Sequence, residues 1–152
     1  MANSQSQNHA KYDLNDIEKL RIDTLISKHR DRFDLRVAAS EDLSDLTNET
    51  VGEGVVKNRL KDWCFIQFRD AQRDESYVFL IGLSVEDHTN WCTSQVIATD
   101  LQQGYVRTKS GSLYELIDEP VSQPSLQLVM HVAATFRSWG MSAPLGMPVI
   151  YY

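Results

Sequence analysis

Three residues near the middle of the chain carry groups that could perform covalent chemistry: Cys92, His88 four residues before it, and the adjacent Asp87. A cysteine nucleophile needs an imidazole within hydrogen-bond reach of its sulfur and a third group that orients the ring. This trio would suit a small Cys/His-dependent hydrolase or transferase. Spacing does not establish contact, however, and a cysteine in a Trp-flanked strand is more often a small buried hydrophobic residue. We therefore expect no catalytic residues, with Cys92, His88 and Asp87 as the alternative.

A metal site would draw on the same part of the chain, from Cys64, His88, Cys92 and His131. No close pair among them has the two-residue spacing of a zinc knuckle, and His131 lies among apolar neighbours that favour a core position. The sequence also has no Walker-type glycine loop, no dinucleotide-binding fingerprint and no Gly-x-Ser-x-Gly elbow. We expect neither a metal nor a cofactor.

An uninterrupted acidic segment is the most unusual feature of the sequence. No Lys or Arg occurs between residues 41 and 53, and four acids recur there at four-residue intervals: Glu41, Asp45, Glu49 and Glu53. On a helix beginning at Ser40, like charges four residues apart repel by about 0.2–0.5 kcal/mol per pair, so nothing local favours the row. The row is either a solvated helix face or a surface that complements a basic groove, such as a protein site for nucleic acid backbone.

A hairpin is expected over residues 105–117, where two runs rich in β-branched and aromatic residues flank Ser110-Gly111. A bulged turn with Gly111 in the left-handed region would bury one set of side chains, namely Val106, Thr108, Tyr114 and Leu116. It would turn the other set outward, namely Tyr105, Arg107 and Glu115. A two-residue loop would instead bury an unpaired charge, which is costly. We therefore favour the bulged turn and count Tyr105 and Arg107 as exposed binding residues.

The remaining patterns predict an α+β fold. Apolar and alternating runs predict a four- to five-stranded antiparallel meander, with strands at 63–69, 77–85 and 91–100 before the hairpin. Helical spacing predicts an N-terminal helix over residues 13–32 and a C-terminal helix from Ser125 to Trp139, both packed on the sheet. Residues 33–39 are compatible with a short strand and residues 55–61 with a helical turn. The polar residues 1–11 are expected to be disordered, before a single domain over residues 12–152.

Composition limits the partners and the location. The formal net charge of −6 argues against a protein that coats nucleic acid phosphates, because that task needs clustered Lys and Arg. The same charge disfavours an anionic membrane surface. No apolar run approaches the ~20 residues that span a bilayer, and the polar start has no signal-peptide region. We therefore expect a cytoplasmic protein in which Cys64 and Cys92 remain thiols.

The segment Trp91-Cys-Thr-Ser, followed by Val106-Arg-Thr-Lys-Ser-Gly-Ser-Leu-Tyr-Glu-Leu116, resembles a strand-plus-hairpin element of small uncharacterised bacterial and phage-encoded proteins. The resemblance covers about a sixth of the chain, includes no known active site and carries over no functional residues. What it implies is an origin. Bacterial or mobile-element proteins of this size and acidity are often inhibitors or immunity proteins, including those that block CRISPR complexes.

The expected function is therefore binding to a protein with a basic surface, as an inhibitor or as an immunity or anti-defence protein. Its expected contact residues are Glu41, Asp45, Glu49, Glu53, Tyr105 and Arg107. The enzyme described above is one alternative. A homodimeric accessory subunit is another, in which the C-terminal tail Val149 to Tyr152 pairs across a sheet edge.

Overall fold

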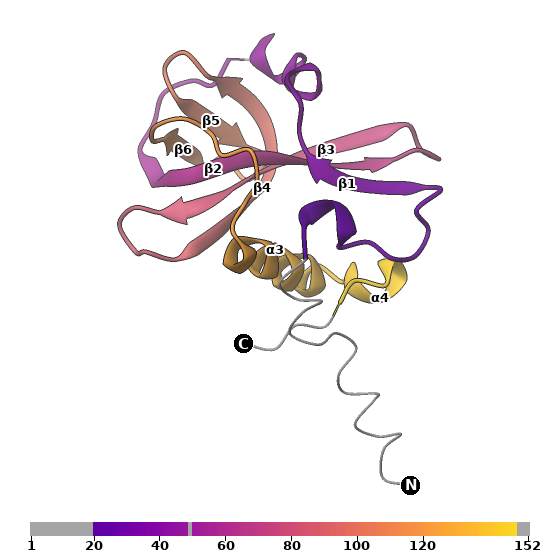
Figure 1. Cartoon of the computed structure of the whole chain (residues 1–152). Coiled ribbons are helices and arrows are strands. Elements are labelled where there is room, and N and C mark those ends of the chain that lie inside the picture. The colour runs from indigo at the N-terminus through magenta and orange to yellow at the C-terminus, as the bar shows by residue number, and fades with distance from the viewer. Residues whose placement is uncertain (1–19, 49, 149–152) are drawn as a thin grey trace, which may run out of the picture.

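The computed structural model describes residues 20–48 and 50–148 and shows a six-stranded sheet with few helices (Figure 1). The strands lie in sequence order: β1 Phe33–Val37, β2 Val56–Asp70, β3 Glu75–Ser84, β4 Asn90–Asp100, β5 Tyr105–Thr108 and β6 Leu113–Leu116. The helical elements are short: the 3-10 turns η1 Ile22–Thr24, η2 Ser40–Leu43 and η3 Leu46–Asn48, and the α-helices α3 Leu126–Ser138 and α4 Ser142–Leu145. The mixed α+β class is confirmed, whereas the predicted strand number of four to five is wrong because β1 joins the sheet.

One end of the sheet is open and the other is closed, because the 15-residue strand β2 serves both. The second half of β2 pairs with β1, antiparallel, from Val37↔Ile66 to Phe33↔Asp70. Its first half pairs with β6, in parallel, from Val56↔Leu113 to Leu60↔Leu116. Since β3, β4 and β5 follow as antiparallel neighbours, the β2–β6 pairing joins five strands into a ring. The helical turn predicted at residues 55–61 is wrong, because pairing holds β2 extended from Val56.

A bulge marks the junction between the two halves of β2. The register with β3 shifts between Lys61 and Cys64, and Asp62 has a φ of 49°. On the facing strand, a Cβ at Gly82 would come within 3.1 Å of the Cβ atoms of Leu60 and Trp63. Glycine at this position therefore lets β2 and β3 approach closely where the strand changes direction.

Two apolar cores lie on either side of this junction. The first fills the space between the open part of the sheet, α3 and the segment after Leu20, and its fully buried members include Leu25, Ile66, Val132 and Phe136. The second fills the closed part and includes Leu60, Leu80, Val96 and Val106. Figure 1 shows α3 lying across one face of the sheet, so the predicted C-terminal helix and its packing are confirmed. No described helix has the length and apolar character needed to cross a membrane.

The N-terminal helix predicted over residues 13–32 is not found in the part of it that the structure describes. Residues 20–32 contain only the turn η1, and residues 1–19, including the predicted disordered tail, lie outside the described chain. The backbone N–H groups of Ser27 and Lys28 donate to the Leu145 carbonyl oxygen, at 3.1 and 2.9 Å. Those donors serve a contact with α4 instead of a helical turn. The apolar side chains at helical spacing are nevertheless buried, with Ile22, Leu25 and Ile26 in the first core.

The helix predicted from Ser40 is also replaced, by the turns η2 and η3. The Asp42 carboxylate accepts from the Ala39 backbone N–H at 2.7 Å and pairs with Arg36 at 3.0 Å, which holds the first turn against β1. The predicted hairpin, in contrast, is present as β5 and β6. Gly111 has a φ of 89°, and Val106 pairs with Tyr114 on the buried face, so the bulged register is confirmed.

Candidate functional site

Arg107 connects the acidic segment with the hairpin. It lies in the middle of β5, on the outer side of the closed part, and is half-buried. Its guanidinium donates three hydrogen bonds to backbone carbonyl oxygens: Nε to Val51 at 2.9 Å, Nη2 to Glu53 at 2.8 Å and Nη1 to Gly111 at 2.8 Å. One side chain therefore anchors both the turn of the hairpin and the loop that precedes β2, which includes residues 41–53 and is called the acidic loop below.

Two glycines allow the loop to fold around that guanidinium. Gly52 and Gly54 both have positive φ, at 77° and 154°, where side-chain-bearing residues are strained. A Cβ on either glycine would lie 3.5 to 3.7 Å from the nitrogens of Arg107. At its other end, the loop is held by Leu43 of η2, which is buried in the core of the closed part. The whole loop is thus fixed at both ends.

Asp42 pairs with Arg36, but the three described acids of the predicted row form no ion pair. Glu41, Asp45 and Glu53 are exposed, and none of them forms an ion pair with any cation among residues 20–48 and 50–148. Arg107 does not pair with them, because its hydrogen bonds go to carbonyl oxygens. The fourth acid, Glu49, lies outside the described residues. The acids do not form a row on one helix as predicted, but three of them are carried by a single anchored loop.

A cleft of about 710 Å³ opens between this loop and the β4–β5 turn. Thr47 and residues 50–53 contribute to one wall, and most of residues 99–105 contribute to the other. One acidic residue lines each side, Glu53 and Asp100, and half-buried Tyr105 also lines the cleft. The structure therefore brings together two of the predicted binding residues, Glu53 and Tyr105, from segments about fifty residues apart.

Sequence reasoning missed the second wall. Asp100 shapes it: one carboxylate oxygen accepts from the Gln103 backbone N–H at 3.0 Å, and its carbonyl accepts from Gly104 at 2.8 Å. Beside it, Thr99 is 2 % exposed, and its hydroxyl has no hydrogen-bond partner in the described part of the chain. The Asp-to-Gly spacing could have located the turn. No sequence signal places that turn beside the acidic loop, because the contact is between distant segments.

A second hollow of about 400 Å³ adjoins the cleft, and both are lined by Thr50. Asp45 lines this hollow together with Ile97, which is turned outward where the β4–β5 register shifts between Val96 and Ala98. Ile97 is 42 % exposed, and Leu101 at the cleft is 47 % exposed. Each hollow therefore combines an acid with an exposed apolar side chain.

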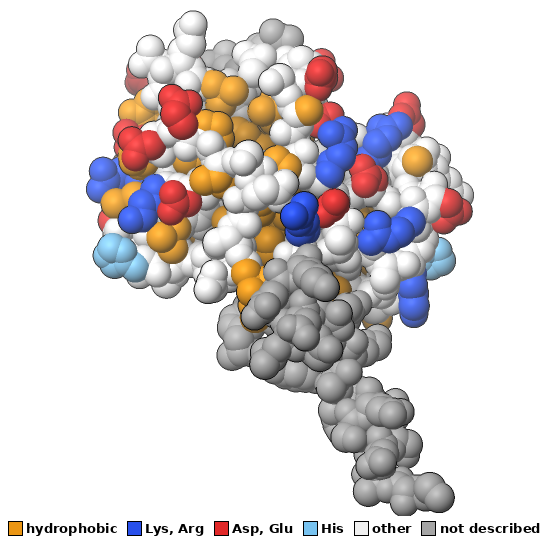
Figure 2. Space-filling view, viewed as in Figure 1, with side chains coloured by type: hydrophobic (Ala, Val, Ile, Leu, Met, Phe, Trp, Pro, Cys, Tyr) orange, Lys and Arg blue, Asp and Glu red, His pale blue; other side chains and the backbone are white. Residues whose placement is uncertain are grey.

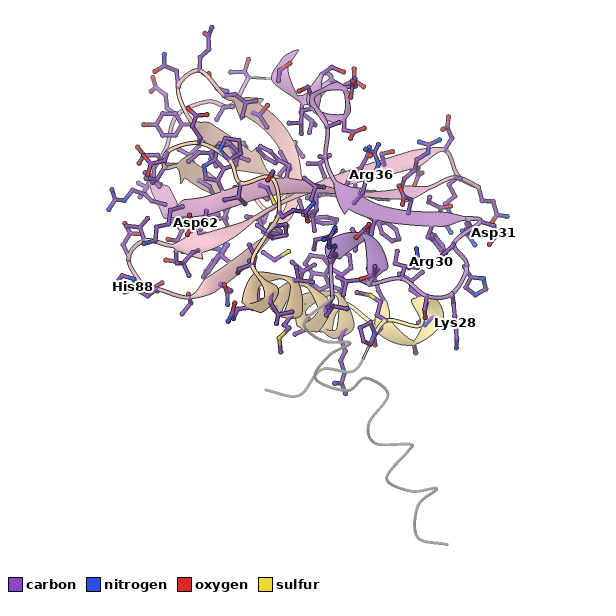
Figure 3. All side chains as sticks on the ribbon, in the orientation of Figure 1. Lys28, Arg30, Asp31, Arg36, Asp62 and His88 are labelled. Carbon is purple, nitrogen blue, oxygen red and sulfur yellow. The ribbon has the colours of Figure 1, made fainter. Side chains whose placement is uncertain are left out.

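The alternative catalytic trio is not brought together. Cys92 on β4 and Cys64 on β2 both pair with Ile81 of the intervening strand β3. Burial raises the pKa of both thiols to about 12, so neither is a thiolate near neutral pH. Figure 3 places His88 at the outer end of the β3–β4 turn, and both His88 and Asp87 are exposed. No hydrogen bond joins Cys92 to either of them in the described structure.

The described residues also contain no group of three or more His, Cys, Asp or Glu side chains placed to hold a metal ion. His131, considered above as a ligand, lies on α3 and is half-buried, and burial lowers its pKa. A lower pKa keeps the imidazole neutral near pH 7. This is the behaviour expected of a histidine that packs beside the core.

Cations gather at the other end of the molecule. Figure 2 shows Lys and Arg side chains on the side that carries β1 and the β2–β3 hairpin, interleaved with acidic ones. Several form ion pairs there: Arg32 with Asp70 at 3.1 Å, Arg36 with Asp42 at 3.0 Å and Arg69 with Asp74 at 2.6 Å. This end is therefore a mixed surface of paired charges, unlike the acidic loop.

Comparison with known proteins adds no assignment: no family model matches the chain, and neither does any curated protein or solved structure.

Proposed function

We propose that this protein acts by binding a protein partner with a basic surface, as small inhibitors and immunity proteins do. The observation that carries the proposal is the Arg107 anchor, which holds the loop by its carbonyl oxygens and leaves Glu41, Asp45 and Glu53 without an ion pair in the described part of the chain. Charges held in place before binding need less ordering when the partner arrives. A fixed acidic surface also speeds encounter with a basic partner and rejects acidic ones.

Apolar side chains beside the acids supply what charge alone does not. Exposed charges at an interface mainly affect association rate and specificity, whereas desolvated apolar and aromatic anchors supply most of the affinity. Ile97, Leu101 and Tyr105 lie beside the two acidic hollows, and Val55 just beyond the loop is 91 % exposed. This combination favours a protein surface as the partner over a free cation.

The specific form of this proposal is an anti-defence inhibitor that occupies a site for nucleic acid backbone, because such sites are basic. The resemblance of residues 91–116 implies only a bacterial or phage origin, where proteins of this size and acidity are often inhibitors, and the acidic loop supports only the basic partner. The homodimer alternative stays a prediction, since Val149 to Tyr152 lie outside the described residues. Nothing in the geometry around Cys92 favours the enzyme alternative.

The experiment compares two variants of equal net charge. Glu41→Gln with Asp45→Asn removes two charges from the loop, and Asp118→Asn with Glu119→Gln removes two exposed charges from the β6–α3 linker. Tagged full-length proteins are used to capture partners from bacterial lysate at low and at high salt. Each captured protein is then purified and its association rate is measured. We expect the loop variant to associate more slowly by on the order of tenfold at low salt, and the linker variant to match the parent.

Equal association of all three proteins at both salt concentrations would remove the charged-loop mechanism. A slower rate for both variants would mean that net charge, and not this loop, governs binding.

A further inference from the structure

We infer that a pocket at the open end of the sheet binds an apolar carboxylate, that is, a ligand in which an aromatic or aliphatic group lies next to a single carboxylate. The pocket has a volume of about 300 Å³ and is lined by the start of β1, the end of β2, the β2–β3 turn and the segment around α4. It shares no lining residue with the cleft beside the acidic loop. The inference therefore goes beyond the proposed function and does not depend on it.

The floor of the pocket is apolar and is built on the first core. The Phe33 and Phe68 rings stack with their centroids 5.5 Å apart, and both pack in or against that core. The volume is at the lower end of the range for ligand pockets, so the floor suits one group of about the size of a phenyl ring. The apolar lining residues are Phe33, Phe68, Met141, Pro144 and Leu145.

Two guanidinium groups share one carboxylate at the edge of this floor. The Asp70 side chain is 7 % exposed, and its carboxylate accepts from Arg32 Nε and Nη2 at 3.1 Å each and from the Gln72 backbone N–H at 3.1 Å. The hydrogen bond from Arg32 lowers the pKa of Asp70, so this carboxylate is charged near neutral pH. Asp70 is the only acid among the described residues that line the pocket. Arg32 and Arg73 together therefore leave an excess of one positive charge.

Arg73 is the cation that Asp70 leaves without a close partner. Its Nε lies 3.8 Å from Asp70 Oδ2, its side chain is 68 % exposed, and its guanidinium donates no hydrogen bond within the described chain. A guanidinium presents paired N–H donors that match the two oxygens of a carboxylate. A carboxylate bound by Arg73 would hold its hydrocarbon part over the apolar floor.

The charges around the pocket favour a monoanion. An excess of one positive charge is balanced by one carboxylate, whereas a phosphate dianion would exceed it. Glu75 accepts a hydrogen bond from the hydroxyl of the lining residue Tyr77, but Glu75 is exposed and does not line the pocket. Water and salt therefore screen its repulsion, while Arg73 contacts the ligand directly.

The pocket is held in shape before a ligand arrives. The Arg32 guanidinium lies between the Asp70 carboxylate and the Phe33 ring, with Cζ 4.6 Å from the ring centroid. On the opposite side, the backbone N–H groups of Ser27 and Lys28 donate to the Leu145 carbonyl oxygen and fix the end of α4. Little ordering therefore opposes binding.

The test is a titration of the ¹⁵N-labelled full-length protein with small probes. 3-Phenylpropionate carries both parts of the expected ligand, 3-phenylpropionamide keeps the ring without the charge, and acetate keeps the charge without the ring. We expect 3-phenylpropionate to shift the amide resonances of Arg73, Gly140 and Met141. Each of the other two probes should bind about tenfold more weakly or worse, because it lacks one of the two contacts.

A further probe, N-acetyl-phenylalanine, distinguishes two sources of the same chemistry, since it represents the last residue of a polypeptide. Tighter binding than that of 3-phenylpropionate would indicate a peptide C-terminus as the ligand. Weaker binding would indicate a free small acid.

Arg73→Gln and Arg69→Gln are a matched pair of variants. Each removes one cation from the β2–β3 hairpin, but Arg69 pairs with Asp74 and does not line the pocket. Arg73→Gln should weaken the binding of 3-phenylpropionate about tenfold and leave that of 3-phenylpropionamide unchanged, which also shows that the pocket is intact. Arg69→Gln should leave the binding of both probes unchanged.

The inference is overturned if 3-phenylpropionate shifts no pocket resonance at concentrations on the order of tens of millimolar. It is also overturned if the amide or acetate binds as well as 3-phenylpropionate, or if the two arginine variants lose the same affinity. None of these measurements involves Glu41, Asp45 or Glu53, so failure here leaves the proposed function standing.

Discussion

Replacing Arg107 with Met tests whether one side chain holds the acidic loop in place. The substitution keeps the length of the apolar stem and removes all three hydrogen bonds to Val51, Glu53 and Gly111. Hydrogen bonds from a charged donor contribute about 1.5–3 kcal/mol when desolvated, and less at an exposed site. The bond to Val51 is part-buried and the other two are exposed, so we expect a loss of about 2–3 kcal/mol in the free energy of unfolding.

Urea unfolding followed by circular dichroism measures this loss, and backbone ¹⁵N order parameters show where the chain becomes more mobile. For a chain of 152 residues, the expected loss corresponds to a Tm decrease of about 5–10 °C. The order parameters of Gly52 and Gly54 should fall first, because Arg107 is the contact that holds that backbone. Lys109→Met is the matched control. Lys109 is an exposed cation on the same hairpin, so the control should stay within about 0.5 kcal/mol of the parent.

The reasoning is refuted if Arg107→Met and Lys109→Met unfold with the same free energy. It is also refuted if the loop glycines keep the parental order parameters in Arg107→Met, since the loop would then be held by other contacts. Arg107→Lys should fall between the parent and Arg107→Met, because an ammonium retains the charge but cannot span three carbonyl oxygens.

Three further predictions concern the rest of the molecule. Cys64 and Cys92, whose pKa values are raised to about 12, should react with a thiol reagent near neutral pH only in urea; rapid labelling of native Cys92 would instead favour the enzyme alternative. The hydrogen bond from Arg32 lowers the pKa of Asp70, so the stability from this pair is present above the unfolded value and is lost as pH falls through the lowered pKa. The urea midpoint between about pH 5 and pH 2 should therefore fall less in Asp70→Asn than in the parent, and an equal fall would contradict the assignment. Phe136→Ala should lose about 3–5 kcal/mol in urea unfolding, because this buried ring packs on several others, and a loss below 1 kcal/mol would contradict the packing of α3.

Local patterns predicted local structure. The hairpin of β5 and β6 follows from alternation and from Gly111, because register and turn type are decided within about ten residues. The start and the packing of α3 follow from Ser125 and the apolar stripe behind it. The parallel pairing of Val56 with Leu113 could not be predicted in this way. The segment Val56 to Lys61 is polar and irregular. Its residues up to Arg59 pair in register with β6, more than fifty residues away, and β3 pairs only with Leu60 and Lys61.

The candidate site was likewise predicted only in part. Sequence reasoning identified Glu41, Asp45 and Glu53 as an uninterrupted acidic segment. It also expected Arg107 to be an exposed binding residue, whereas the side chain is half-buried and its guanidinium binds the loop. It did not predict that Arg107 binds that segment, since no pattern within either region specifies the contact. It also placed the acids on a helix. The backbone instead forms two 3-10 turns. In the first turn the Asp42 carboxylate accepts from the Ala39 backbone N–H, and Leu43 is buried in the core of the closed part.

The proposed binding surface lies on the closed part of the sheet. Its shape should therefore depend little on the packing of the open part. Leu43 packs in the core around Val96 and Val106, and Arg107 holds the loop from β5 of the same closed part. Helix α3 packs on the other core, around Ile66 and Phe136. A destabilising substitution in α3 should therefore lower the free energy of unfolding and leave the affinity for the protein partner unaltered while the protein remains folded. A substitution of Arg107 should weaken binding of the protein partner at temperatures where the fold is intact, because the acidic loop loses its anchor before the core is affected.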